Sequence, residues 1–312
     1  MKPIKRVYLS GLGAIGSIYA AQLHNYDPEC LSVIVDRERL QRYQQNEITI
    51  NGRAYQFNYI LPDSPAEPAD LIIIAVKQHH LSESIQAIRK FVGSETIILS
   101  LLNGITSEEI IGREYGMDKL LYSFVVGTDA VREGTVTTCS TLGKIVFGEA
   151  KNSEYSAKVV LVKDLFDRAA IPYQIPEDML QQLWWKFMMN VGINQTSAIL
   201  RAPYGVFQRI TEARELMENA AREVLLIAQK AGINLTEADI RSFAGIINGL
   251  SPEGKTSMLQ DVEAGRKTEV EIFAGTVVEL GKQYGVATPI NEVLLRMIRT
   301  IEQRYQQPKS WH

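Results

Sequence analysis

A glycine-rich hexapeptide near the start of the chain limits its possible folds more than any other feature. Gly11, Gly13 and Gly16 follow a short apolar run, 7–9, and open an amphipathic segment, 14–23. In this setting Gly11 permits a tight turn, Gly13 lets a pyrophosphate approach the backbone, and Gly16 lets the first helix pack closely on the first strand. The amino end of that helix offers unpaired N–H groups to phosphates. The sequence therefore predicts an α/β fold that binds a dinucleotide.

Further apolar runs indicate a doubly wound, mostly parallel sheet. Three of them, 31–35, 71–76 and 97–101, lack the alternation of a half-exposed strand, as expected where helices cover both faces of a sheet. After the first of these runs, Asn51-Gly52 has the residue types of a type I′ turn, which predicts a small inserted hairpin. A β-rich stretch at 122–148 is expected to extend the edge of the sheet in antiparallel fashion.

The second half of the chain has a different pattern. Pro172 and Pro176 break any helix, and the residues after them show helical periodicity almost throughout. The expected helices are 178–200, 214–231, 237–247, 268–284 and 291–306. The predicted fold class is thus an N-terminal Rossmann-type α/β domain with a C-terminal all-helical domain. We place the dinucleotide-binding domain at 1–175 and a substrate and dimerisation domain at 176–312.

Composition excludes several classes of protein. Lysine and arginine total 33 against 36 acidic residues, with a net charge of −3 and no basic stripe, so nucleic-acid binding is not expected. No apolar run reaches the about 20 residues of a membrane span, and the N-terminus lacks the features of a signal peptide. Two cysteines are too few for a disulfide framework, and no pair of histidines has metal-ligand spacing. We expect a cytoplasmic protein without a metal or a membrane partner.

Asp36 ends the second predicted strand, 20 residues after Gly16. A carboxylate at this position can accept hydrogen bonds from an adenosine ribose and would repel a 2′-phosphate, which favours NAD(H). The neighbouring Arg37, with Arg39 and Arg42, could instead bind that phosphate, so the choice between NAD(H) and NADP(H) stays open.

Lys77 and Asn103 stand just past the carboxyl ends of two buried strands. In an open α/β sheet this edge forms the ligand crevice, so both residues are candidate cofactor contacts. Simple solvent exposure is the alternative interpretation, above all for a lone lysine.

A stripe of polar residues gives the sharper signal. Lys186, Asn190 and Asn194 recur every four residues on a helix whose other positions are mostly apolar or aromatic. Burying a cation and two amides is costly unless something pairs with them, which implies a polar ligand or partner. A helix with a narrow solvent-exposed stripe is the alternative.

Two later residues could complete such a site. Glu269 opens a predicted helix and could face Lys186, keeping its amine charged and oriented. Taken alone, Ser257 would be a helix cap and Glu269 a first-turn acid favoured by the helix dipole.

Taken together, these motifs resemble the ketopantoate reductase (2-dehydropantoate 2-reductase) family over nearly the whole chain. The matching segments are Gly11-Leu-Gly-Ala-Ile-Gly16, Val76-Lys77, Asn103-Gly104, Leu183-Trp-Trp-Lys186 with Asn190 and Asn194, Ser257-Met-Leu-Gln-Asp261, Thr268-Glu269, and Gly285-Val-Ala-Thr-Pro289-Ile-Asn291. The resemblance implies reduction of 2-dehydropantoate to (R)-pantoate, a step toward pantothenate and coenzyme A, with hydride from a reduced nicotinamide.

The resemblance also implies roles for individual residues. Lys186 would be the general acid, supported by Glu269, and Asn190, Asn194 and Ser257 would position the substrate. Lys77 and Asn103 would contact the cofactor.

Three positions depart from the family pattern. Asp36 stands where many members have an arginine and use NADPH, Gly254 where an asparagine is usual, and Gln195 where a proline is usual.

Other functions remain compatible with the residues. One is a reductase for another branched 2-oxo acid, such as 2-oxoisovalerate, on the same scaffold. Another is a non-catalytic dinucleotide sensor, although it gives no reason for the polar stripe. The small-molecule partner is expected to be a 2-oxo acid. A homodimer is compatible with apolar positions at 243–250 or 272–280, which could equally be core.

Overall fold

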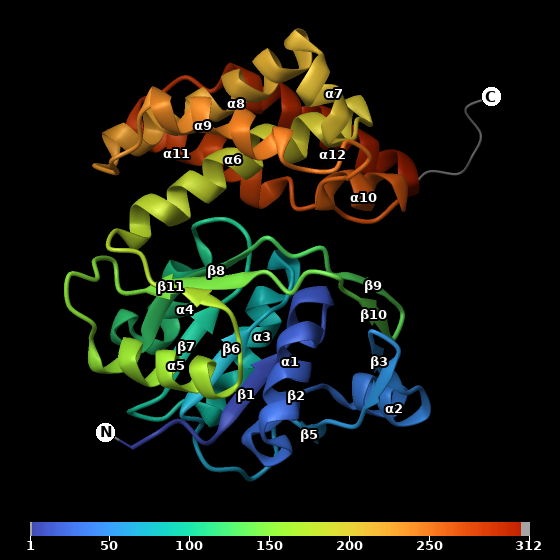
Figure 1. Ribbon diagram of the computed structural model, residues 1–312, viewed down its shortest axis with the longest axis vertical. Coiled ribbons are helices and arrows are strands. Elements are labelled where there is room, and N and C mark those ends of the chain that lie inside the picture. Colours follow the sequence, from blue (N-terminus) through green and yellow to red (C-terminus); the bar gives the residue numbers. More distant parts are fainter. Residues whose placement is uncertain (1, 307–312) are drawn as a thin grey trace. The chain divides into compact units, whose positions relative to one another are not determined.

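The computed structural model describes residues 2–306, which form two compact units (Figure 1). The first unit ends at Leu180 and the second begins at Gln181, later than the boundary at 175/176 predicted from the two prolines. After Pro176 the backbone still pairs with the first unit. Glu177 O accepts a hydrogen bond from Asn152 N at 2.8 Å, and Met179 N donates to Ala150 O at 3.1 Å.

The first unit is built on an eight-stranded sheet with the order β12-β11-β8-β7-β6-β1-β2-β5. Its strands are β1 (Val7–Ser10), β2 (Leu31–Ile34), β5 (Asn58–Ile60), β6 (Leu71–Ile74), β7 (Ile97–Ser100), β8 (Leu120–Val126), β11 (Lys144–Gly148) and β12 (Tyr173–Gln174). The chain runs from β1 to β2 on one side and later to β6 on the other, so the strand order reverses at β1. This reversal confirms the predicted doubly wound sheet.

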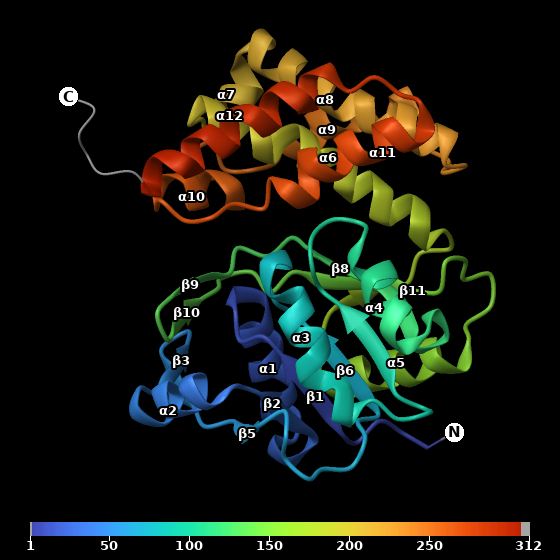
Figure 2. The ribbon, with the colours of Figure 1, turned by 180° about the vertical axis from the view of Figure 1, so that it is seen from behind.

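Helices cover both faces of this sheet (Figures 1 and 2). The α-helices are α1 (Ala14–Tyr26), α2 (Arg37–Gln45), α3 (Leu81–Ile88), α4 (Ser107–Tyr115) and α5 (Ala157–Arg168), and the 3₁₀ turns are η1 (Pro28–Cys30), η2 (Gln78–His80), η3 (Arg89–Phe91) and η4 (Met117–Lys119). Side chains alternate along β1: Val7 and Leu9 join the core formed with α1 and α5, and Tyr8 joins the core formed with α3 and α4. Burial on both faces explains the continuous apolar runs.

A second, four-stranded sheet has the order β4-β3-β10-β9. It consists of β3 (Ile48–Ile50), β4 (Arg53–Tyr55), β9 (Val131–Glu133) and β10 (Val136–Thr138). The predicted hairpin is confirmed, because Ile50 pairs with Arg53 and both turn residues have positive φ, 50° at Asn51 and 76° at Gly52.

The prediction for the stretch 122–148 is wrong in two respects. β8 pairs with β7 in parallel, because the α4 crossover lies between them, and only β11 runs antiparallel, to β8. The strands β9 and β10 do not extend the main sheet. They pair with the β3–β4 hairpin, whose β3 edge accepts β10 in parallel.

In the second unit every regular element within residues 181–306 is helical. The elements are α6 (Met179–Leu200), which begins in the first unit, α7 (Tyr204–Arg209), α8 (Thr211–Lys230), α9 (Glu237–Asn248), α10 (Ser257–Glu263), the π-helical turn η5 (Glu271–Gly275), α11 (Thr276–Tyr284) and α12 (Pro289–Gln306). The long helix α8 contacts α7, α9, α11 and α12. Among the described residues, 2–306, no helix has the length and apolar character needed to cross a bilayer.

Candidate functional site

In the first unit, most of the predicted cofactor residues lie at the carboxyl edge of the main sheet. The last residues of the adjacent strands β1, β6 and β7 are in register, Ser10 beside Ile74 and Ile74 beside Ser100. The loops that follow these strands therefore leave from one edge. They carry the glycine-rich loop, Lys77 and Asn103, and Asp36 follows the neighbouring β2.

Two of the three glycines are required by the packing of the chain itself. Gly11 has a φ of 105°, and a Cβ there would lie 2.7 Å from Ala75 O. A Cβ on Gly16 would lie 1.8 Å from Gly11 O, because α1 packs directly on the turn. Any larger residue at either position would displace backbone.

Gly13 differs from its two neighbours. It is the N-cap of α1, with a φ of −73°, and a Cβ there would come no closer than 3.7 Å to Ala75 O. Neither strain nor packing within the chain requires a glycine here, and no side chain caps the first turn of α1. The position thus leaves room and N–H donors for a pyrophosphate, so the loop fits a dinucleotide.

Asp36 is the N-cap of α2 as well as the residue after β2. Its Oδ1 accepts a hydrogen bond from Arg39 N at 2.6 Å, and its Oδ2 lies 3.0 Å from the Arg39 guanidinium. Arg37 is exposed and lies 3.3 Å from Asp63. The acid that would repel a 2′-phosphate therefore stands beside guanidinium groups that would attract one.

Two further residues were not predicted, one at this edge and one against the glycine-rich loop. Gln78, next to Lys77, has a buried Oε1 that lacks a hydrogen-bond partner within the described part of the chain. Arg132, from β9, donates to Leu12 O and, at 2.6 Å, to Ser17 Oγ, and burial lowers the pKa of its guanidinium. Nothing in the sequence indicated Arg132, because its position depends on the unforeseen pairing of β9 in the second sheet.

Glu108 is a buried acid close to the same edge. It lies in the first turn of α4, five residues after Asn103, and is 1% exposed. Its carboxyl group accepts hydrogen bonds from Ser107 Oγ at 2.8 Å and Ser123 N at 3.3 Å. Burial raises the pKa of Glu108 to about 7.

In the second unit, the polar stripe lies on α6 as predicted. Lys186 is 9% exposed and Asn194 is 7% exposed, while Asn190 is half-buried. Within residues 2–306 the structure gives the side-chain amides of the two asparagines no hydrogen-bond partner. The stripe is thus not a solvent-exposed face, and its amides can hydrogen-bond a polar ligand.

Two other segments meet α6 beside this stripe. Thr256 Oγ1 donates to Ser197 Oγ at 3.2 Å, and Ala274 N donates to the side chain of Gln195 at 3.1 Å. The first contact places the segment that carries Ser257 next to the end of α6. The second does the same for the segment that follows Glu269.

The local interpretations of Ser257 and Glu269 were wrong. Thr256, not Ser257, is the N-cap of α10, because its Oγ1 accepts from Leu259 N at 3.1 Å. Ser257 is the first helical residue and is exposed. Glu269 precedes the π-helical turn instead of opening an α-helix, and the first-turn acid is Glu271.

Gly254, which stands where an asparagine was expected, is constrained by a neighbouring ring. A Cβ at Gly254 would lie 3.0 Å from the ring of Tyr204, whose backbone N donates to Gly254 O at 3.0 Å. A larger residue at position 254 would therefore have to displace the ring of Tyr204, at the start of α7.

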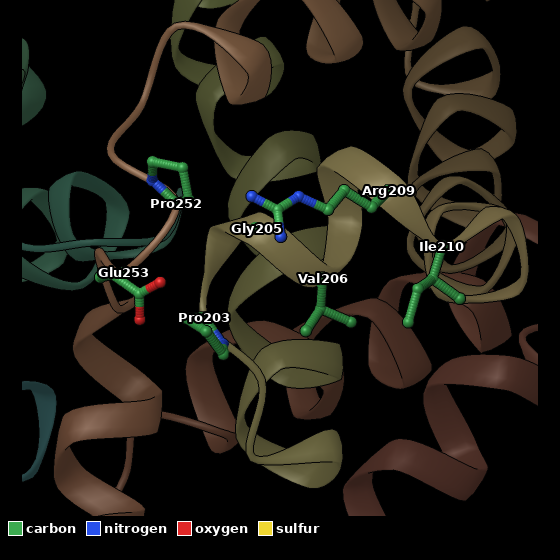
Figure 3. A pocket seen from close by; sticks show the side chains of 7 residues that line it. All are labelled: Pro203, Gly205, Val206, Arg209, Ile210, Pro252 and Glu253. Atoms are coloured by element: carbon green, nitrogen blue, oxygen red, sulfur yellow. The ribbon is translucent and has the colours of Figure 1, made fainter.

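A shallow pocket of about 280 Å³ lies elsewhere on the second unit (Figure 3). It is formed by α7 and the loop before α10, and it is lined by Pro203, Gly205, Val206, Arg209, Ile210, Pro252 and Glu253. None of the predicted site residues lines it. Among the described residues no group of three or more His, Cys, Asp or Glu side chains could hold a metal ion.

Comparison with known proteins supports the resemblance over both units. Residues 7–152 match the family model "Ketopantoate reductase PanE/ApbA", and residues 178–302 match its C-terminal counterpart. The chain is 27% identical over 310 residues to a 2-dehydropantoate 2-reductase of Aquifex aeolicus, covering 96% of this chain and 97% of that protein. It is 26% identical to the enzyme of Vibrio cholerae, covering 96% and 98%.

Solved structures share the fold. A dimeric ketopantoate reductase from Staphylococcus aureus superposes with a TM-score of 0.81 at 22% identity, covering 96% of this chain and 99% of that one. D-mandelate dehydrogenase in a ternary structure with NADH and anilino(oxo)acetate superposes with a TM-score of 0.86 at 21% identity, covering 97% and 100%. The chain therefore belongs to the ketopantoate reductase family, whose members are oxidoreductases that act on CH–OH groups with a nicotinamide dinucleotide.

Proposed function

We propose that this chain is a 2-dehydropantoate 2-reductase, which reduces 2-dehydropantoate to (R)-pantoate on the way to pantothenate and coenzyme A. A reduced nicotinamide dinucleotide, when bound, supplies the hydride. The residues that would hold it are those at the carboxyl edge: Gly11, Gly13, Gly16, Asp36, Arg37, Lys77 and Asn103. The room for a Cβ at Gly13 and the lack of a side-chain cap on the first turn of α1 support this assignment.

The observation that carries the proposal is the burial of Lys186 in a helix that is mostly apolar around it. When hydride reaches a ketone carbon, negative charge develops on the oxygen. An ammonium within hydrogen-bond reach stabilises that charge and then donates its proton. Lys186 is the residue that would do both, with Glu269 supporting it.

The asparagines on the stripe and Ser257 would position the substrate. Amide groups hydrogen-bond a carboxylate and a hydroxyl, the polar groups that a 2-oxo acid such as 2-dehydropantoate offers beside its ketone. The two amides are on the same side of α6 as Lys186, so they can hold these groups while the ketone faces the amine.

We further propose that residues 1–175 bind the dinucleotide and that residues 176–312 bind substrate and form a homodimer. The dimeric state named for the Staphylococcus aureus relative supports a homodimer. Of the two segments considered for an interface, residues 272–277 are buried within the chain, whereas Ile246 and Leu250 are 37% and 39% exposed. Light scattering of the purified protein tests this state.

Reduction of another 2-oxo acid is the second candidate. Gly254 contributes no side chain where the family pattern has an asparagine, and its backbone is held against Tyr204. A similar fold also serves D-mandelate dehydrogenase. A substrate with a different group on the oxo acid is compatible with this change.

The test is a side-by-side assay of NADH and NADPH oxidation with 2-dehydropantoate, 2-oxoisovalerate and an aromatic 2-oxo acid. We expect the highest kcat/KM with 2-dehydropantoate. Lys186→Ala should lower kcat by about 10²–10⁴-fold while cofactor affinity survives. Lys282→Ala, which removes an exposed lysine from α11, is the matched control and should keep wild-type rates.

Each result has a defined meaning. Equal rates for wild type and Lys186→Ala would remove Lys186 from the mechanism. A higher kcat/KM with another oxo acid would support the second candidate, and binding of cofactor without any turnover would contradict both.

A further inference from the structure

Gln195 is a fully buried amide on α6 that forms three hydrogen bonds, one within α6 and two to other segments, η5 and α12. It follows Asn194 directly and is 0% exposed. Its Nε2 donates to Val191 O at 2.8 Å and to Asn291 Oδ1 at 3.1 Å, and its Oε1 accepts from Ala274 N at 3.1 Å. Both N–H donors and the carbonyl oxygen are thus used inside the protein.

The bond to Ala274 accounts for the π-helical turn. In an α-helix Ala274 N would bond to Val270 O, but here Gly275 N takes that carbonyl at 3.1 Å, five residues back. The Ala274 N–H is satisfied by Gln195 instead. A side chain inserted into the backbone ladder is a known cause of such interruptions, and π-helical turns often occur at functional sites.

This turn sets the direction of the residues before it. One extra residue in a helix rotates everything upstream by about 100° relative to the helix that follows. Glu269 lies immediately upstream, and its carbonyl accepts from Ile272 N at 3.1 Å. Without the π-helical turn, Glu269 would point elsewhere with respect to α11.

Asn291, which accepts a hydrogen bond from Gln195 Nε2, is itself held in place by several hydrogen bonds. Asn291 donates through Nδ2 to Ala220 O at 3.0 Å and to Glu223 Oε2 at 2.7 Å. The Glu223 carboxylate also accepts from the backbone N–H groups of Ile290 and Asn291, in the first turn of α12, at 2.7 and 3.0 Å. This acid at a helix N-terminus fixes Asn291, so Gln195 has one defined orientation.

We propose that Gln195 is a positioning residue for the reductase reaction: its amide holds the π-helical turn and thereby orients Glu269 relative to Lys186 on α6. The proposal rests on the proposed function for the roles of Lys186 and Glu269. Its physical content is that a bond between α6 and η5, made next to the polar stripe, sets the geometry of the residues that stabilise the reacting oxygen.

The experiment compares Gln195→Met with Thr196→Val. Methionine keeps the volume and removes all three hydrogen bonds, so Ala274 N can return to Val270 O and rotate Glu269. We expect kcat to fall about tenfold or more, with the KM for the cofactor unchanged. Thr196 is the matched control because it is also 0% exposed and, among the described residues, its Oγ1 bonds only within α6, to Gly192 O and Ile193 O. Thr196→Val should lower the melting temperature but keep kcat.

A second change separates positioning from packing. Deleting Ala274 in the Gln195→Met background removes the extra residue, so a regular helix would present Glu269 and α11 in their original directions. We expect this deletion to restore much of the lost kcat. A folded double variant without recovery would overturn the proposal, as would wild-type kcat in Gln195→Met or an equal loss in Thr196→Val.

Two controls keep the outcome interpretable. Wild-type turnover is measured first, because its absence would reject the proposed function, whereas an active wild type with an unaffected Gln195→Met would reject only the positioning role. If Gln195→Met does not fold, Gln195→Leu replaces it. Leucine also removes the acceptor for Ala274 N, so the same fall in kcat is expected, and a wild-type kcat there would overturn the proposal.

Discussion

Some single residues have contacts or burial that their expected roles do not account for. Asp36 caps α2 and forms an ion pair with Arg39, in addition to standing where a ribose is expected. Glu108 differs more from an ordinary surface glutamate, because its carboxyl group is almost fully buried. Within residues 2–306 it forms no salt bridge with a basic side chain, and the nearby Glu109 raises the Glu108 pKa further.

The raised pKa of Glu108 predicts a specific pH dependence of stability. The pKa is about 7 in the folded chain and 4.5 for an unperturbed glutamate, so between these values the folded state holds a proton that the unfolded state has lost. The free energy of unfolding should therefore fall as pH rises from about 4.5 to about 7, by up to about 3 kcal/mol. Glu108→Gln, which mimics the protonated form, should remove this fall and be more stable than wild type near pH 8.

Urea unfolding near pH 5 and near pH 8 measures this difference. Glu109→Gln is the matched control, because Glu109 is the next residue on α4 and is exposed. It should keep most of the wild-type slope, because Glu109 is the smallest cause of the raised Glu108 pKa. A Glu108→Gln variant with the wild-type pH dependence would show that Glu108 is not the titrating group.

At the scale of elements, the glycines in the connection from β1 to α1 differ in whether the packing of the chain requires them. A Cβ on Gly11 or Gly16 would collide with nearby backbone, whereas a Cβ on Gly13 would meet Ala75 O at an ordinary contact distance of 3.7 Å. A short stretch can therefore contain glycines that packing requires beside a glycine that packing does not require. The π-helical turn likewise depends on more than its own segment, because its Ala274 N–H donates to Gln195 on α6.

Two alanine substitutions test this difference between the glycines. Gly16→Ala should destabilise the first unit by about 1–3 kcal/mol or more, because its Cβ would collide with the backbone at Gly11. Gly13→Ala should leave the free energy of unfolding within about 1 kcal/mol of wild type but weaken cofactor binding at least about tenfold. Urea unfolding and a fluorescence titration with NADPH and NADH measure the two effects. Wild-type cofactor affinity in Gly13→Ala would contradict the assignment of this loop.

At the scale of the whole molecule, the two units place different chemistry in different parts of the chain. The glycine-rich loop belongs to the unit that ends at Leu180, and Lys186, Ser257 and Glu269 belong to the other. A ligand stabilises the state that binds it, so the cofactor should act on the thermal transition of the first unit.

Calorimetry can detect that effect. With cofactor at 100 times its Kd, we expect the transition that includes the first unit to gain about 2.7 kcal/mol, a rise of roughly 5–10 °C in Tm. The Gly13→Ala variant at the same cofactor concentration should show a much smaller rise. If neither NADH nor NADPH moves any transition of the wild type, the chain does not bind the dinucleotide as proposed.

The sequence by itself determined the parallel strands β1, β2, β6 and β7, the glycine-rich turn, the helical second half and the polar stripe of Lys186, Asn190 and Asn194. Each of these depends on patterns within a few residues: apolar runs, a glycine spacing, or a repeat of four along a helix. They can be predicted because local backbone geometry and burial directly restrict which residue types occur at each position.

Only the tertiary structure decided the features that depend on partners distant in the chain. The pairing of β10 with β3 joins residues 136–137 to 49–50, and the π-helical turn needs Gln195 to bond with Ala274, 79 residues away. The pKa of Glu108 likewise depends on burial beside β8 and on Ser123. A strand edge, an amide or a carboxylate can pair with many partners, and which one it meets is set by the packing of the whole unit.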